Sequence, residues 1–217
     1  MAPEPFEQFA PVLGWPVAHF FTVRVPKVDV KGEKAVVVPR LEEFHRRISG
    51  QQGVDFDRVI RCEQTHGDGS VYVDGNTLSP VPVVDGLFTD RPGVALGIHV
   101  ADCAPVYVYD ARTPAIALIH SGRKGTEADI VGKTLDRMMG RFGSGPSDYR
   151  VFIGPCIHAC HYETDIAPMI QDQCRQRGIG QVADSGICTA CHPDRYYSYR
   201  MEQGRTGRLF AVLMLKA

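Results

Sequence analysis

The sequence lacks long apolar runs and an excess of charge of either sign. No stretch of the 217 residues approaches 18 apolar positions, which excludes a membrane-spanning helix from the expected elements. The 24 Lys and Arg residues nearly balance the 25 Asp and Glu residues, and a net charge of −1 argues against a nucleic-acid-binding surface. The acidic, Pro-interrupted N-terminus does not resemble a signal peptide, so we expect a cytoplasmic protein.

Internal repeats, low-complexity segments and long linkers are also missing. The apolar fraction of 44% and the charged fraction of 23% are typical of a soluble globular chain. A folded chain of this size buries roughly 70% of its surface, so neither a metal nor disulfides are needed for folding. We therefore expect one domain over residues 1–217, with residues 1–18 as a loosely ordered N-terminal extension.

Short apolar runs bounded by Gly, Pro or Asp predict buried strands. These runs lie at residues 35–38, 94–100, 106–109, 115–119, 151–153 and 209–215, and the last is typical of a central strand. Helical spacing of apolar residues predicts three helices. The first follows Pro39, the second begins at a capping box of Thr126 and Asp129 and stops at Gly140, and the third ends before Gly178. Alternating strands and helices indicate a layered α/β or α+β domain.

Seven cysteines and eight histidines stand out from this ordinary composition. An odd number cannot pair completely within one chain, and in a cytosolic protein such residues are more often buried thiols, metal ligands or nucleophiles. His66, Cys103 and His120 each lie near the end of a predicted strand. One thiolate and two imidazoles suit a zinc site with an open fourth position, and they equally suit copper. A nucleophile–base pair of Cys103 and His120 without metal is a further interpretation.

The segment after His120 is glycine-rich and basic. Gly122, Arg123 and Lys124 precede a predicted helix, and backbone N–H groups at such a position favour an anion such as phosphate. The alternative is a tight turn whose glycines only satisfy the backbone. Near the C-terminus, Tyr199 and Arg200 belong to an aromatic and basic stretch that suits a planar base or an anion, or simply a half-buried edge strand.

Two further clusters combine cysteine with histidine. They are Cys156, Cys160 and His161, and then Cys188, Cys191 and His192. The second has the spacing of a c-type haem attachment site, although nothing in the sequence indicates export. A structural zinc site is one interpretation. We favour packing thiols near the site that are able to form a disulfide on oxidation.

Several motifs, taken in order, resemble a bacterial family described as multicopper polyphenol oxidoreductase (laccase-domain) proteins, whose members are also described as purine nucleoside phosphorylase/adenosine deaminase enzymes and as a peptidoglycan editing factor. The matching segments are 64–67, 84–89, 101–105, 120–125, 153–157, 162–163, 188–189, 197–200 and 206–208. The ordered set is far more specific than any single motif.

The resemblance implies a single-domain, four-layer α/β/β/α sandwich with one metal ion, zinc in preference to copper, held by His66, Cys103 and His120. It implies phosphorolysis of adenosine, inosine or guanosine and deamination of adenosine, with a purine nucleoside and phosphate as the small-molecule partners. We expect a monomer or small homo-oligomer. Copper-dependent phenol oxidation, hydrolysis of amino-acid–sugar cell-wall precursors and a non-catalytic metal-binding or redox-sensing protein remain alternatives.

The resemblance also assigns roles around the metal. Arg40, Lys124 and Arg200 would hold phosphate or the charge on the leaving base, and Gln64 and Asp102 would orient ligands or substrate. Substrate would further contact three positions, which are Gly122, Arg123 and Tyr199.

Overall fold

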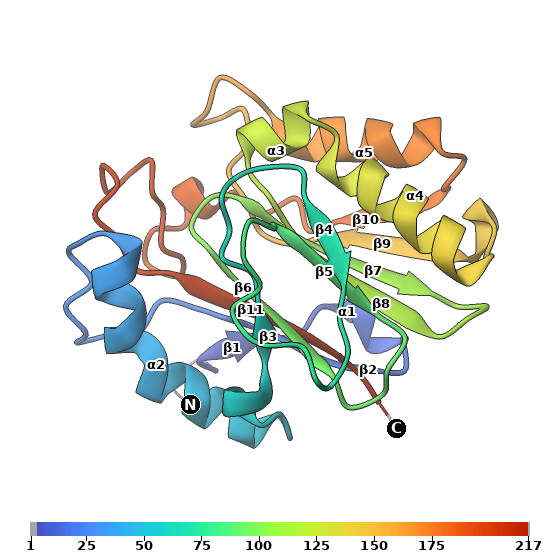
Figure 1. Cartoon of the computed structure of the whole chain (residues 1–217). Helices are drawn as coiled ribbons and strands as arrows, with labels where there is room; N and C mark the ends of the chain where they lie inside the picture. Colours follow the sequence, from blue (N-terminus) through green and yellow to red (C-terminus); the bar gives the residue numbers. More distant parts are fainter. Residues whose placement is uncertain (1–3, 217) are drawn as a thin grey trace.

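Two β-sheets packed face to face form the centre of the molecule (Figure 1). The computed structural model describes residues 4–216. The order of the five-stranded sheet is β1 (Phe6–Glu7), β2 (Val17–Thr22), β11 (Leu209–Leu215), β6 (Ala95–Val100) and β3 (Ile60–Arg61). The order of the six-stranded sheet is β10 (Gln181–Asp184), β9 (Tyr149–Ile153), β7 (Ala104–Asp110), β8 (Ala115–Ser121), β5 (Gly86–Thr89) and β4 (Ser70–Tyr72).

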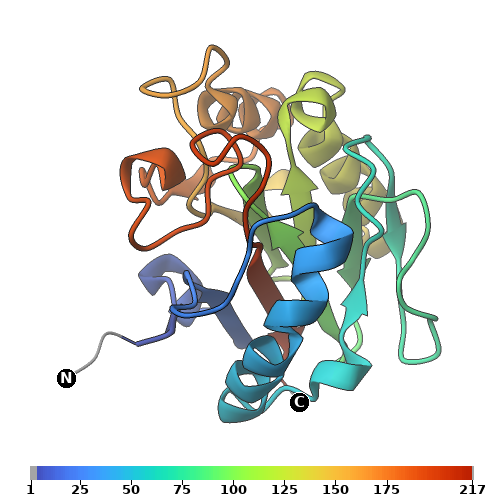
Figure 2. The same cartoon turned by 90° about the vertical axis from the view of Figure 1, so that its left-hand side faces the viewer.

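Helices cover the outer face of each sheet. The long helix α2 (Lys34–Gln51) packs on the five-stranded sheet, through Phe44 and Ile48 against Phe20 and Phe210. Figure 2 shows α2 from the side. The six-stranded sheet is covered by α3 (Arg123–Glu127), α4 (Ile130–Phe142) and α5 (Ile166–Gln176). The short elements are α1 (Ala10–Leu13), η1 (Phe56–Arg58), η2 (Pro146–Asp148) and η3 (Thr189–Cys191). The predicted four-layer α/β/β/α sandwich is confirmed.

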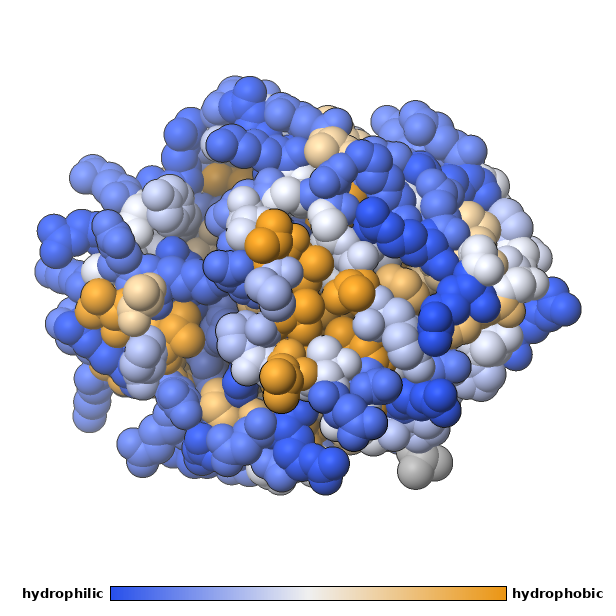
Figure 3. Space-filling view, in the orientation of Figure 1, coloured by the Kyte–Doolittle hydropathy of each residue, from blue (hydrophilic) through white to orange (hydrophobic). Residues whose placement is uncertain are grey.

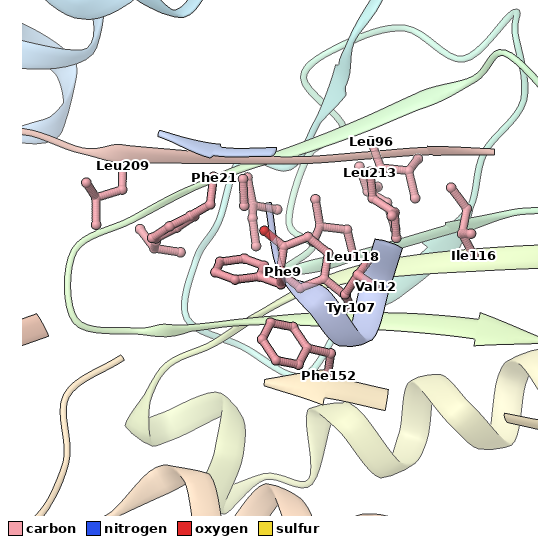
Figure 4. Packing of buried hydrophobic residues seen from close by; sticks show 14 of the residues in the cluster. Phe9, Val12, Phe21, Leu96, Tyr107, Ile116, Leu118, Phe152, Leu209 and Leu213 are labelled. Carbon is pink, nitrogen blue, oxygen red and sulfur yellow. The ribbon is translucent and has the colours of Figure 1, made fainter. Parts of the chain in front are cut away.

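The main core lies between the two sheets. Phe9, Phe21, Tyr107, Leu118 and Phe152 meet there (Figure 4). Because helices close the outer faces, β6, β7 and β8 are buried along their whole length, which explains their continuous apolar sequences. The face shown in Figure 3 is mainly hydrophilic, and hydrophobic side chains gather toward its middle.

The expected strand at residues 35–38 is wrong, because this run forms the first turns of α2. Val37, Leu41 and Ile48 are buried while Val36 is exposed, so the helical period outweighs the preference of the three valines for a strand. Pro39 lies inside this helix rather than before it. Near the beginning of a helix its missing N–H removes one backbone hydrogen bond without ending the element.

The helix expected from Thr126 to Gly140 is divided into α3 and α4. Asp129 breaks it with a left-handed φ of 66°, and its carboxylate accepts a 2.6 Å hydrogen bond from Arg177. The helix α4 continues past Gly140 to Gly143, whose φ of 68° provides a left-handed C-terminal cap. The third predicted helix is confirmed as α5, and the predicted central position of the last strand is confirmed by β11.

The N-terminal segment is not a loose extension over the residues that the structure describes, while residues 1–3 lie outside them. Strand β1 pairs with β2 in antiparallel register. Phe9, Val12 and Trp15 then enter the core between the sheets. Three large apolar side chains within seven residues stabilise the packed state strongly, and this outweighs the helix- and strand-breaking effect of the surrounding prolines.

We predict that Phe9→Ala lowers the free energy of unfolding by about 3 kcal/mol, because it leaves a cavity in the core. The Phe9 ring lies 4.8 Å from that of Phe152 and 5.8 Å from that of Tyr107. Leu13→Ala in the same segment is the control, since Leu13 is 58% exposed and should change stability by less than about 0.5 kcal/mol. Equal denaturant midpoints for the two variants would contradict this packing.

Candidate metal centre

Three separate connections bring His66, Cys103 and His120 together at one end of the sandwich. His66 lies in the loop after β3, and His120 is the penultimate residue of β8. Cys103 lies in the turn from β6 to β7, where the chain crosses from one sheet to the other. One ligand atom of each residue lies within 4.8 Å of the other two. The structure therefore places the three side chains grouped from the sequence at a single point.

The carboxylate of Asp85 fixes the orientation of the His120 ring. This fully buried carboxylate accepts a 2.7 Å hydrogen bond from Nδ1 of His120. This bond turns Nε2 of His120 toward the other two side chains, the arrangement that fixes the ring of a metal-ligating histidine. Sequence reasoning assigned Asp85 no role, although it lies in the matched segment 84–89.

The same carboxylate holds the loop that carries His66. Asp85 accepts backbone hydrogen bonds of 2.9–3.0 Å from Thr65, His66 and Gly67. The backbone of His66 has a left-handed φ of 60°, which is unfavourable for a non-glycine residue. The three N–H bonds compensate this strain and fix the direction of the His66 side chain.

Charge around the three side chains favours a thiolate. Burial opposes ionisation of Cys103, but His120 and His66 outweigh it and lower the pKa of the thiol to about 6. Burial also disfavours the Asp85 anion, yet hydrogen bonds from His120 and from the backbone of Gly67 and His66 lower its pKa to about 2. Thiolate and imidazole are the forms that bind a metal ion.

Gly122 keeps space open beside the ligands. A Cβ at this position would stand 2.8 Å from Sγ of Cys103 and 3.2 Å from Cδ2 of His66. Two imidazoles and one thiolate, with free space on the cleft side, fit a zinc ion with an open fourth position and also fit copper. Gly122 thus lies against two of the three side chains, and a larger residue at this position would crowd them.

The three side chains line a cleft of about 990 Å³. Five cationic side chains share this cleft: Lys34, Arg123, Lys124, Arg200 and Arg208. Its aromatic lining is provided by Tyr162 and Tyr199. The cleft thus combines a metal-ligand set with positive charge and planar apolar surface.

Two predicted residues, Gln64 and Asp102, line the cleft, and their side chains also hold loops in place. Gln64 donates to the carbonyl of His99 at 2.6 Å and accepts from its N–H at 2.9 Å, which joins the His66 loop to β6. The Asp102 carboxylate accepts from the hydroxyls of Thr189 (2.6 Å) and Ser198 (3.0 Å) and from the backbone N–H of Arg200 (2.7 Å). Both side chains are fully engaged within the protein.

The expectation that Arg40 holds phosphate disagrees with the structure. Arg40 lies on α2, pairs with Asp29 at 2.9 Å and does not line the cleft. Lys34, six residues earlier on the same helix, lines it instead. The role of Arg40 was implied by the family resemblance alone, and in the structure its guanidinium is held by Asp29.

The other predicted residues lie at the cleft. Arg123 and Arg200 both bind the carboxylate of Glu163, at 3.0 Å and 2.9 Å, and this shared partner fixes them on one wall. Lys124 is exposed and forms no ion pair with any residue in the range 4–216. Tyr199 is 55% exposed and lines the cleft.

Comparison with known proteins agrees with this architecture. The model of the multi-copper polyphenol oxidoreductase laccase family matches residues 38–167 and 162–216, and the chain belongs to this family. A purine nucleoside phosphorylase of Clostridium acetobutylicum is 31% identical over 180 residues, covering 71% of this chain and 75% of the relative. The purine nucleoside phosphorylase YlmD of Geobacillus stearothermophilus is 30% identical over 208 residues, covering 77% and 76%.

Solved structures show the same fold. The crystal structure of YlmD from Geobacillus stearothermophilus superposes with a TM-score of 0.87 at 25% identity, covering 99% of this chain and 100% of that one. A hypothetical protein YfiH of Bacillus licheniformis gives the same TM-score and coverage at 26% identity. Within residues 4–216, none of the helices has the length and apolar character needed to cross a bilayer.

We predict that Asp85→Asn lowers metal affinity 10–100-fold, the usual cost of removing a carboxylate that orients a ligating histidine. Competition with a chromophoric chelator measures the affinity. Asp68→Asn is the matched control. Asp68 lies in the loop that carries His66, but its carboxylate pairs with Lys133 on the surface. Unchanged affinity in Asp85→Asn would contradict the role assigned to this carboxylate.

Gly122→Ala should weaken metal binding at least tenfold while the protein stays folded, because the new methyl group would stand against Cys103 and His66. Gly140→Ala provides the comparison, since a Cβ there has no neighbour within 4 Å in the described structure. A helix-interior alanine should leave the melting temperature unchanged or raise it. Equal metal affinity in both variants would refute the steric role of Gly122.

Proposed function

We propose that the protein is a zinc-dependent enzyme that cleaves purine nucleosides with phosphate and deaminates adenosine. The observation that carries this proposal is the cleft, where a three-residue metal-ligand set faces two partly buried cations, Lys34 and Arg208, that lack carboxylate partners within the described range. The names of the two relatives, both purine nucleoside phosphorylases, support the same activity.

Lys34 and Arg208 supply the argument for phosphate. Arg208 donates one guanidinium nitrogen to the carbonyls of Thr206 and Gly207, at 2.7 Å and 2.9 Å. Lys34 donates to the carbonyl of Glu63 and to the side-chain oxygen of Gln64. Burial lowers the pKa of both cations, and each also feels neighbouring charges. Two partly buried cations held only by neutral acceptors form a site for an anion.

Aromatic side chains supply a surface for the base. Tyr199 presents an exposed ring to the cleft, and the Arg200 guanidinium lies 5.1 Å from the centre of the Tyr162 ring. A planar purine can stack on such faces. Lys124, without an ion pair in the described structure, can move toward negative charge on a departing base.

In phosphorolysis, a phosphate oxygen attacks C1′ of the ribose while the bond from C1′ to the purine nitrogen breaks. The base takes a proton and leaves, and ribose 1-phosphate forms. Lys34 and Arg208 would orient the phosphate and reduce its repulsion from the ribose oxygens, and Lys124 would stabilise the leaving base. In deamination, water adds at C6 of adenosine and ammonia leaves, giving inosine.

His66, Cys103 and His120 would hold the zinc ion, which when bound would activate water as a nucleophile at neutral pH. The protein groups around it have separate tasks. Asp85 keeps the His120 ring in one tautomer, and the bonds from Gln64 to His99 fix the His66 loop. Asp102 holds the loop that carries Tyr199 and Arg200 over the cleft.

Assays of metal-loaded protein with inosine, guanosine and adenosine test the proposal. We expect phosphate-dependent release of the free base, ammonia release from adenosine, and loss of both after chelation. Phenol oxidation with oxygen uptake by the copper-loaded protein, without base release, would favour the copper-dependent alternative that the ligand set also fits. Absence of base and ammonia release at full zinc loading would refute the proposed function.

Arg208→Gln should raise the KM for phosphate at least tenfold and leave the KM for nucleoside nearly unchanged, because only the anion loses a partner. Arg205→Gln is the matched control, since Arg205 is exposed three residues earlier and does not line the cleft. Initial rates at varied phosphate concentration measure the effect. A change confined to the KM for nucleoside would contradict a phosphate site at Arg208.

A further inference from the structure

A second group of metal-ligand side chains lies outside the cleft. Ligand atoms of Cys160, His161, Cys188 and Cys191 all lie within 4.8 Å of one another. Cys160 and His161 belong to the loop between β9 and α5. Cys188 lies directly before η3, and Cys191 is the last residue of η3. These two loops lie side by side at the same end of the molecule (Figures 1 and 2).

The separations between the donor atoms match a tetrahedral site. Sγ of Cys160 lies 3.4 Å from Sγ of Cys191. Nδ1 of His161 lies 3.4 Å from Sγ of Cys160, 3.5 Å from Sγ of Cys191 and 4.0 Å from Sγ of Cys188. Zinc bonds of about 2.3 Å to sulfur and about 2.0 Å to nitrogen place tetrahedral donors roughly 3.5–3.8 Å apart. Small side-chain movements therefore suffice to enclose an ion.

The backbone around Cys188 directs N–H groups at its sulfur. The thiol of Cys188 accepts hydrogen bonds from the backbone of His158, Ala190 and Cys191. The spacing of Cys188 and Cys191, with two residues between them, lets N–H groups of the turn point at the first sulfur. Two cysteines with this spacing commonly supply two of the four ligands of a structural zinc site.

Packing does not explain these side chains. Cys160 and Cys191 are exposed, which disagrees with the expectation of packing thiols, and only Cys188 of the three is buried. A disulfide between Cys160 and Cys191 would use two of the four donor atoms. It would not explain why the ring of His161 and the thiol of Cys188 lie beside them. Cys156 and His192 are not part of the group. Cys156 is fully buried, and His192 is exposed.

We propose that Cys160, His161, Cys188 and Cys191 bind a second, structural zinc ion that joins the two loops forming one wall of the cleft. All four ligands come from the protein, which is the closed coordination of a structural site. The ion is distinct from the one assigned to His66, Cys103 and His120.

The position of this second site gives it a mechanical consequence. One loop carries Tyr162 and Glu163, and the other continues to Tyr199 and Arg200, which line the cleft. Between the loops, the backbone provides bonds from Cys156 to Ile187 (3.2 Å) and from Thr189 to Cys156 (2.9 Å). A zinc ion adds a cross-link to a region otherwise held by few bonds, and so fixes the wall against which a ligand rests.

Metal content and visible spectra test the second site without reference to activity. Reduced protein, stripped with a chelator and reloaded with zinc, should bind two ions per chain. Cys103→Ser should bind one, and a Cys160→Ser/Cys191→Ser variant should bind one. With cobalt in place of zinc, Cys103→Ser should keep the intense bands of a site with three thiolates, whereas the double variant should keep only the weaker bands of a single thiolate.

His192→Ala is the matched control, because His192 is exposed next to Cys191 but outside the group, and it should bind two ions. Zinc should also protect Cys160 and Cys191 from alkylation in the wild type and in Cys103→Ser. One ion per chain in the loaded wild type, lost in Cys103→Ser, would overturn the proposal. So would a Cys160–Cys191 disulfide that persists in the reduced, zinc-loaded protein.

Discussion

The carboxylate of Asp85 is the interaction on which the rest of the site depends. One oxygen holds the His120 ring, and the two oxygens together bind three successive N–H groups of the loop that carries His66. A single buried anion thus fixes two ligands that come from different sheets. Without it, the left-handed backbone at His66 would lose its compensation and the His120 ring could rotate. The strand β5 that follows Asp85 anchors this carboxylate in the six-stranded sheet.

The sandwich supplies the remaining geometry. The chain leaves one sheet at β6 and enters the other at β7, and Asp102 and Cys103 occupy that crossing. Cys103 turns toward the two histidines, and Asp102 binds the C-terminal loop that brings Tyr199 and Arg200 to the cleft. The metal-ligand set, the partly buried cations Lys34 and Arg208 and the aromatic side chains of the cleft therefore meet where two sheets and two long loops converge. The second cysteine-rich group lies in the same pair of loops.

Continuous apolar runs and rare polar residues at their ends are local features, so the sequence predicted most of the buried strands and the grouping of His66, Cys103 and His120. The four-layer sandwich was predicted from the family resemblance. The predictions from the sequence were wrong where contacts between distant segments determine the structure. The valines at residues 35–38 became helical through packing on a sheet whose neighbours are distant in sequence. Asp85 and Lys34 were missed because their importance arises from partners 18–35 residues away. Arg208 was missed because its importance arises from its partly buried place in the cleft.

The most direct test of the account is anomalous diffraction at the zinc edge from crystals of the zinc-loaded protein soaked with phosphate. Besides the peak expected at the second, cysteine-rich site, the account predicts a zinc peak between His66, Cys103 and His120, with a phosphate beside Lys34 and Arg208 in the same cleft. A cleft that binds phosphate elsewhere, or a zinc peak absent from these three ligands at full loading, would contradict it.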